Sequence, residues 1–257
     1  MSDVEGKRRF TGANGSLWAT LILAAGVFAW LWPIGLGSKM PVGGDVTQFF
    51  MGLIGFLSQS LKAGRLPVWN YLWGYGFAGV GESQMGFYYP PHLLLYGALP
   101  RELAYVASFL FHPLCGATGA WWAARRFGVS QTGAVLSGFC YAASGFSLIH
   151  MPHPWGYTSG AWMPWAWGLG RLILEPGTTR RSGLAFLLTL VLFVQLLIGH
   201  FQIAFMTVVT LGLMAVWGGF LEGFLRRRDR EDEDEREGEN VAGRWRLGVM
   251  LIACVAV

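Results

Sequence analysis

Long apolar segments recur along the chain and are separated by shorter polar stretches. A helix needs roughly 20 apolar residues to cross the hydrocarbon core of a bilayer. Six segments approach or reach this length, at 17–36, 103–124, 132–150, 157–174, 184–200 and 203–224. The pattern predicts an all-α, polytopic transmembrane helical bundle, with residues 1–16 as a cytoplasmic N-terminal tail and residues 17–257 as the transmembrane domain.

A further apolar run begins at Leu247 and stops at Val257, where the sequence ends. It covers about half a span, and backbone groups that stopped inside a bilayer would lack hydrogen-bond partners. We therefore expect 247–257 to be a truncated seventh span and the chain to be the N-terminal part of a longer protein.

The basic residues sort to one side of the predicted bundle. If the N-terminus lies in the cytoplasm, only four of the 19 Lys and Arg residues face outward: Lys39, Lys62, Arg65 and Arg101. Cytoplasmic loops of membrane proteins carry an excess of Lys and Arg. This distribution predicts a multi-pass protein of the cell inner (plasma) membrane with a cytoplasmic N-terminus. The mixed-charge stretch 226–246 is then a cytoplasmic linker.

The composition agrees with a membrane protein and argues against a soluble domain. Hydrophobic residues make up 53% of the chain and charged residues 13%, whereas a soluble domain carries roughly 25% charged residues. The three cysteines lie in apolar stretches and have neither metal-site nor disulfide spacing. We expect the lipid bilayer as a partner and do not expect a nucleic acid.

The longest polar interval is the predicted first outer loop, residues 38–100. Within it, the stretch 45–63 places apolar residues at three- and four-residue intervals and polar residues on the other face. It is too polar to span a bilayer, so it predicts an amphipathic helix that lies in the membrane interface. Gly64 is a natural stop for this helix.

Acidic residues are scarce on the predicted outer side. Only Asp45, Glu82 and Glu102 lie there, and no carboxylate falls at the middle of a predicted span. Glu102 begins a helix and suits its dipole. Asp45 has two interpretations that the sequence leaves open. With Gln48 three residues later it resembles a capping box, and as an outer-face acid beside two glycines it is a candidate catalytic group.

Other polar and aromatic side chains of the outer loops are candidates for substrate contact. His150 and His153 have a spacing that could suit a metal, but no third ligand is evident nearby, so the metal is unknown and a divalent ion stays an open alternative. The candidate substrate-binding residues are Gln48, Arg65, Trp69, Asn70, Glu82, Gln84, Tyr89, His92, His153, His200 and Gln202.

Taken in order, several short pieces of the chain resemble the YfhO-like family of bacterial membrane proteins, which belongs with the GT-C-type membrane glycosyltransferases. The resemblance covers about residues 15–257, the N-terminal part of a longer family chain. The matching pieces are Gly44-Asp45 with Gln48-Phe49, the stretch 64–70, Gly74-Tyr75-Gly76, Tyr89-Pro90-Pro91 and the stretch 199–202.

This resemblance implies a GT-C-like fold in which the first long outer loop carries a catalytic Asp. Asp45 matches that position and would act as general base on an acceptor hydroxyl or help to hold a divalent metal. The implied donor is a polyprenyl-phosphate-linked sugar, and the implied acceptor is a cell-envelope polymer (an envelope glycan) or a lipid on the outer face. Some GT-C families have paired acids where this chain has one, so metal dependence stays open.

Two other functions remain as alternatives. A transporter or flippase of lipid-linked precursors would be expected to carry charged or broken helices at mid-membrane. A non-catalytic membrane assembly factor would be expected to tolerate loss of the Asp45 carboxylate. Arg65 is a candidate ligand for a donor phosphate, because a guanidinium binds phosphate in a bidentate manner.

Overall fold

The computed structural model describes residues 13–35, 43–79, 84, 86–175 and 177–218. Glu82, the end of the sixth apolar segment, the charged linker 226–246 and the apolar run 247–257 lie outside the described residues. The described part is mostly helical, as the apolar pattern predicts.

From α5 onward the helices follow one another with short connections, whereas 27 residues separate α4 from α5. In chain order they are α2 (Ala13–Trp30), α3 (Trp32–Gly35), the π-helical turn η1 (Val46–Phe50), α4 (Met51–Lys62), α5 (Pro90–Ala98), α6 (Arg101–Arg126), α7 (Gln131–Ala142), α8 (Gly145–Ile149), α9 (Pro154–Gly160), α10 (Met163–Leu174), α11 (Arg181–Leu196) and α12 (Phe201–Val216). Between α4 and α5, β1 (Trp69–Asn70) and β2 (Phe77–Ala78) pair in antiparallel fashion.

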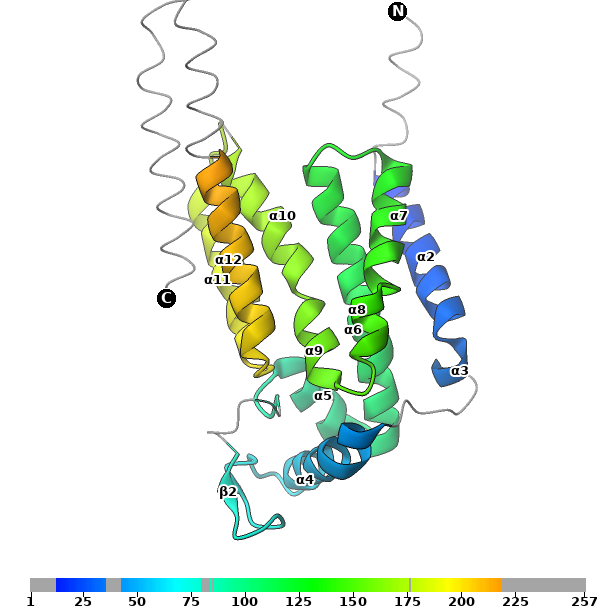
Figure 1. Cartoon of the computed structure of the whole chain (residues 1–257), viewed down its shortest axis with the longest axis vertical. Helices are drawn as coiled ribbons and strands as arrows, with labels where there is room; N and C mark the ends of the chain where they lie inside the picture. The colour runs from blue at the N-terminus through cyan, green and yellow to red at the C-terminus, as the bar shows by residue number, and fades with distance from the viewer. Residues whose placement is uncertain (1–12, 36–42, 80–83, 85, 176, 219–257) are drawn as a thin grey trace, which may run out of the picture.

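The long helices run side by side, and α4 lies across one end of the bundle (Figure 1). In this view α2, α6 and α7 form one side and α10, α11 and α12 the other, and the hairpin of β1 and β2 extends beyond α4 at the lower end. The α8–α9 and α11–α12 turns reach the same end as η1 and α4. The predicted outer loops therefore meet at one end of the bundle.

Two helical segments of the described part are long and apolar enough to cross a membrane, Arg101–Arg126 and Gln131–Ile149. The other apolar helices are shorter, among them Leu17–Trp30, Arg181–Leu196 and Phe201–Val216. The predicted segment 157–174 is broken into α9 and α10. Pro164, in the first turn of α10, lacks the N–H that would continue a helical ladder, which favours a new helix start there.

The amphipathic helix predicted at 45–63 is present, but it does not begin as an α-helix. Its first turn, η1, is a π-helix, and the α-helical part begins at Met51 and ends at Lys62. Leu53, Ile54 and Leu57 on one face are buried in a core that α5, the start of α6 and Trp155 complete. Gly64 then takes a positive φ of 67°, a conformation that glycine adopts without steric cost.

Small residues let α6 and α10 approach closely. A Cβ on Gly168 of α10 would collide with the ring of Trp122 on α6, and a Cβ on Gly119 of α6 would lie 2.6 Å from Nε1 of Trp165. The two indoles stack with centroids 5.5 Å apart. Close approach through glycine is typical of helix packing in membranes.

Candidate functional site

The carboxylate of Asp45 pairs with a histidine from the opposite half of the chain. Its Oδ2 lies 3.1 Å from Nε2 of His153, and both side chains are about half exposed. Asp45 is itself in the right-handed helical region, and in the described structure its side chain makes no capping hydrogen bond. The capping-box interpretation of Asp45 with Gln48 is therefore wrong.

Local structure at both partners explains how they meet. The hydroxyl of Thr47 donates to the carbonyl oxygens of Gly43 and Gly44, which holds the backbone on both sides of Asp45. His153 stands just before α9, whose first residue is Pro154. A Cβ on Gly43 would lie 2.8 Å from Cβ of Pro152, so glycine permits this close approach.

Two further histidines lie close to this pair. The ring centroids of His150 and His153 are 6.2 Å apart, and His150 Nδ1 donates to the carbonyl of Phe146. Burial, followed by the nearby charges of His150 and His153, lowers the pKa of His200 below its ordinary value. Nδ1 of His200 is buried and has no hydrogen-bond partner among the described residues. The site thus holds a carboxylate–imidazole contact and a second imidazole whose Nδ1 has no partner among the described residues.

Ring contacts connect this site to the β1–β2 hairpin. Trp73 of the hairpin meets Phe49 at 4.9 Å between ring centroids, and Phe49 meets Trp155 at 6.1 Å. Trp155 then contacts His153 at 5.9 Å. The hairpin therefore packs back along α4 toward Asp45.

A second group of polar side chains surrounds the buried hydroxyl of Tyr89. Nε1 of Trp162 donates to the hydroxyl of Tyr89, 2.9 Å away, and this hydroxyl lies 2.8 Å from Nε2 of His112. Nδ1 of His112 faces the carbonyl of Ser108 at 2.6 Å, so Nδ1 carries the proton and Nε2 accepts from Tyr89.

His92 also belongs to this network, and like His112 it contacts a backbone carbonyl through Nδ1 and a side-chain hydroxyl through Nε2. Its Nδ1 faces the carbonyl of Gly86 at 3.3 Å and its Nε2 lies 3.3 Å from the hydroxyl of Ser108. Burial lowers the pKa of His92 to about 4. Tyr89 and His92, both candidate substrate ligands by sequence, are thus buried and bonded to protein, where they hold the loop before α5 against α6.

The remaining candidates fall into two places. Gln48, exposed on η1, and Gln202, exposed on α12 next to His200, lie on the elements that carry the Asp45 site. Arg65 is exposed beyond the far end of α4 from Asp45, and the 12-residue α4 alone spans about 18 Å. Trp69 is exposed on the hairpin. Asn70 is buried, and its Oδ1 accepts from the backbone N–H of Leu72.

Gln84 is partly buried and has an interaction partner in the structure. Glu82 lies outside the described residues. Among the residues that the structure describes, no three His, Cys, Asp or Glu side chains form a group that could hold a metal ion. The described residues therefore do not fit a metal centre.

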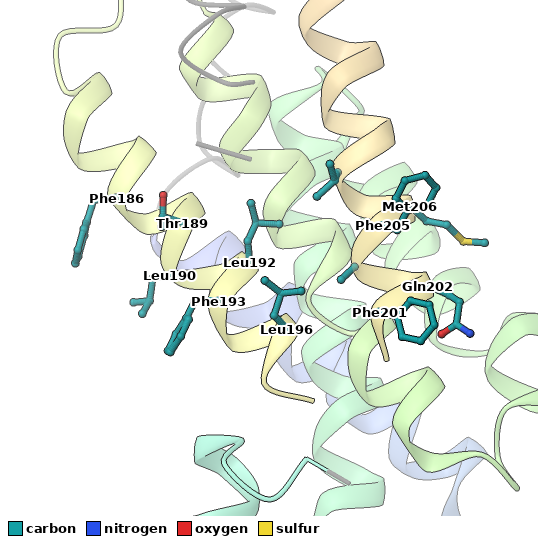
Figure 2. A pocket seen from close by; sticks show the side chains of 12 residues that line it. Phe186, Thr189, Leu190, Leu192, Phe193, Leu196, Phe201, Gln202, Phe205 and Met206 are labelled. Atoms are coloured by element: carbon teal, nitrogen blue, oxygen red, sulfur yellow. The ribbon is translucent and has the colours of Figure 1, made fainter. Parts of the chain in front are cut away.

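An apolar groove of about 910 Å³ runs between α11 and α12 (Figure 2). Phe193 and Leu196 line it from α11, and Phe201 and Phe205 line it from α12. Gln202 adds a polar group at the start of α12, two residues after His200. The groove thus includes the first turn of α12, which follows His200.

Comparison of the chain with models of protein families, with curated proteins and with solved structures yields no match. The function must therefore be argued from the site itself.

Sequence reasoning missed the partner of Asp45 and the purpose of the buried histidines. The sequence shows His153 in an outer turn, but nothing in its spacing from Asp45 indicates contact. His112 lies inside an apolar segment, and a buried polar residue there is a recognisable signal of an internal partner.

Proposed function

We propose that the protein is a multi-pass membrane glycosyltransferase, with a GT-C-like arrangement, that takes sugar from a polyprenyl-phosphate carrier at the outer membrane face. The observation that carries this proposal is the half-exposed Asp45–His153 pair, which separate outer turns bring together. Its acceptor would be a hydroxyl of a cell-envelope polymer or lipid.

Arg101–Arg126 and Gln131–Ile149 are long enough to cross a membrane. The exposed apolar faces of shorter helices support a membrane environment for these helices as well. Large apolar side chains are exposed along α2, α11 and α12. In water such faces would be an aggregation hazard, whereas lipid accommodates them. The exposed set includes Leu17, Trp18, Ile22, Phe186, Leu190, Phe193, Phe205, Met206 and Leu213.

The groove between α11 and α12 suits the lipid part of such a donor. Its lining is almost entirely apolar, which matches a prenyl chain, and it includes Gln202, two residues after His200. A donor lying in this groove would bring its phosphate and sugar toward the histidine cluster. The side chain of His200, which is partly exposed, would then lie near the polar head of the donor.

Asp45 would act as the general base. Nε2–H of His153 donates to Oδ2 and orients the carboxylate, while Oδ1 takes the proton of the acceptor hydroxyl. The acceptor oxygen bonds to the anomeric carbon as the bond from that carbon to the phosphate oxygen breaks, and polyprenyl phosphate leaves. A positioned base contributes about 10²–10⁴-fold to the rate of such a step.

The test is transfer of radiolabelled sugar from a polyprenyl-phosphate donor in membranes that contain the protein. Asp45→Asn removes the carboxylate at nearly constant shape, and we expect it to lower transfer by about 10²-fold or more at equal expression. Glu102→Gln is the matched control, because Glu102 is another exposed acid, paired only with its neighbour Arg101 among the described residues. Unchanged transfer in Asp45→Asn contradicts the proposed base. Absence of transfer by the parent protein favours a transporter or an assembly factor.

A further inference from the structure

The β1–β2 hairpin presents aromatic side chains that no part of the described fold covers. Tyr75 at its turn is fully exposed, and Trp69 and Tyr71 are each more than half exposed. The segment 69–79 contains no charged residue. Exposed apolar patches of this kind on a folded surface usually mark an interaction site.

The hairpin is built so that these rings stay outward. Trp69 faces solvent while its neighbour Asn70 is buried, and Asn70 Oδ1 accepts from the N–H of Leu72 to tighten the turn. Gly76 has φ of 87°, and a Cβ there would lie 2.6 Å from Nε1 of Trp69. The backbone therefore brings Trp69 against the turn.

The base of the hairpin is fixed to the protein. Tyr71 meets Phe56 of α4 edge to face at 6.1 Å, and Trp73 packs on both Phe77 and Phe49. Since Phe49 contacts Trp155, which contacts His153, the exposed rings belong to the same packed unit as the Asp45–His153 pair. A ligand bound on the hairpin would therefore lie at a fixed distance from the Asp45–His153 pair.

We propose that this hairpin is the acceptor platform, on which Trp69, Tyr71 and Tyr75 stack against the sugar rings of a neutral glycan chain. This inference rests on the proposed function and names the class of acceptor. The C–H face of a pyranose ring complements the negative face of an aromatic ring. The three rings lie within seven consecutive residues of one hairpin, so one extended glycan can contact more than one of them.

The neutrality of the hairpin selects this partner over charged ones. A surface that binds anionic lipid headgroups or nucleic acid carries Lys or Arg, and segment 69–79 has none. In Figure 1 the hairpin extends from α4 away from the long helices, so it lies on the far side of α4 from the bundle. Both observations favour an uncharged, water-borne ligand.

The test is direct binding of neutral oligosaccharides to the full chain in phosphatidylcholine nanodiscs. Saturation-transfer NMR and titration would use cellohexaose and maltohexaose, one β-linked and one α-linked glucan. We expect at least one to bind, with its ring C–H protons receiving the saturation. We expect Tyr75→Ala to raise Kd about two- to tenfold, because Tyr75 is exposed and its loss leaves the fold intact. Tyr75→Phe should restore binding, and Phe127→Ala, an exposed ring after α6, should leave Kd unchanged.

Each contrary result overturns the platform. No binding of either hexasaccharide by the parent protein in nanodiscs would mean that the rings lie in lipid or meet a protein partner. An unchanged Kd in Tyr75→Ala would place the sugar elsewhere.

Different results would contradict the glycan platform and the proposed glycosyltransferase activity. Glycan binding that Asp45→Asn leaves intact, without any sugar transfer by the parent, would support the platform and overturn the transferase. Sugar transfer with a Kd indifferent to the hairpin variants would overturn the platform alone.

Discussion

Asp45 Oδ2 lies 3.1 Å from His153 Nε2, and the two residues are more than one hundred positions apart in the chain. A carboxylate that only capped its own helix would not need this partner, and Asp45 makes no such cap. The pair therefore belongs to the tertiary structure, which brings the start of η1 to the turn before α9.

The first prediction separates the roles of the two partners. If Asp45 is the base and His153 orients it, His153→Gln should lower sugar transfer by about tenfold, less than the loss in Asp45→Asn. The double variant should resemble Asp45→Asn alone, because residues that act as one unit are not additive. Sugar-transfer rates for the four proteins in membranes measure this. A loss in His153→Gln as large as in Asp45→Asn would instead make the imidazole the base.

The second prediction concerns the buried hydroxyl of Tyr89. Tyr89→Phe removes the acceptor of Trp162 Nε1–H and the donor to His112 Nε2. Two buried polar groups then lack a partner, and each such loss costs about 1–3 kcal/mol of stability. Denaturant unfolding in detergent measures the change. Tyr88→Phe is the matched control, since the Tyr88 hydroxyl makes a single long contact of 3.5 Å with the Pro67 carbonyl. Equal stability of the two variants would contradict the network.

The third prediction is a pH dependence of stability that originates in His92. Its pKa falls from 6.5 to about 4 in the folded protein, so the unfolded chain binds more protons between these values. The stability contribution is complete above about pH 6.5 and is lost as the pH falls toward 4, roughly 3 kcal/mol in all.

The comparison that isolates this contribution uses His92→Asn, which keeps a donor for the Gly86 carbonyl but does not titrate. Unfolding free energies from pH 7.5 to 4.5 should fall less steeply in the variant than in the parent. Parallel curves would show that His92 does not contribute to the pH dependence.

The fourth prediction tests the close contact of α6 with α10. Gly168→Ala forces a methyl group into the ring of Trp122, which already stacks on Trp165. Overpacking of this kind destabilises by about 1–3 kcal/mol. Gly212→Ala on α12 is the control, because a Cβ there meets nothing within 4 Å. Thermal unfolding should rank Gly168→Ala below the parent and Gly212→Ala at or above it.

The sequence alone determined the local elements. Apolar runs predicted the helices that became α2, α6 and α12, because burial or lipid contact along a whole helix needs a continuous apolar surface. The amphipathic spacing at 45–63 predicted α4, and Gly64 predicted its end. These features depend on neighbours three or four residues away, which a sequence displays directly.

Only the tertiary structure decided which of these elements meet. It paired Asp45 with His153, buried Tyr89 and His92 that the sequence had assigned to substrate, and left Arg65 beyond the far end of α4. It also divided the apolar segment 157–174 into α9 and α10. Such outcomes depend on contacts between residues far apart in the chain, where packing and hydrogen-bond satisfaction override local pattern, and hydrophobic periodicity carries no information about them.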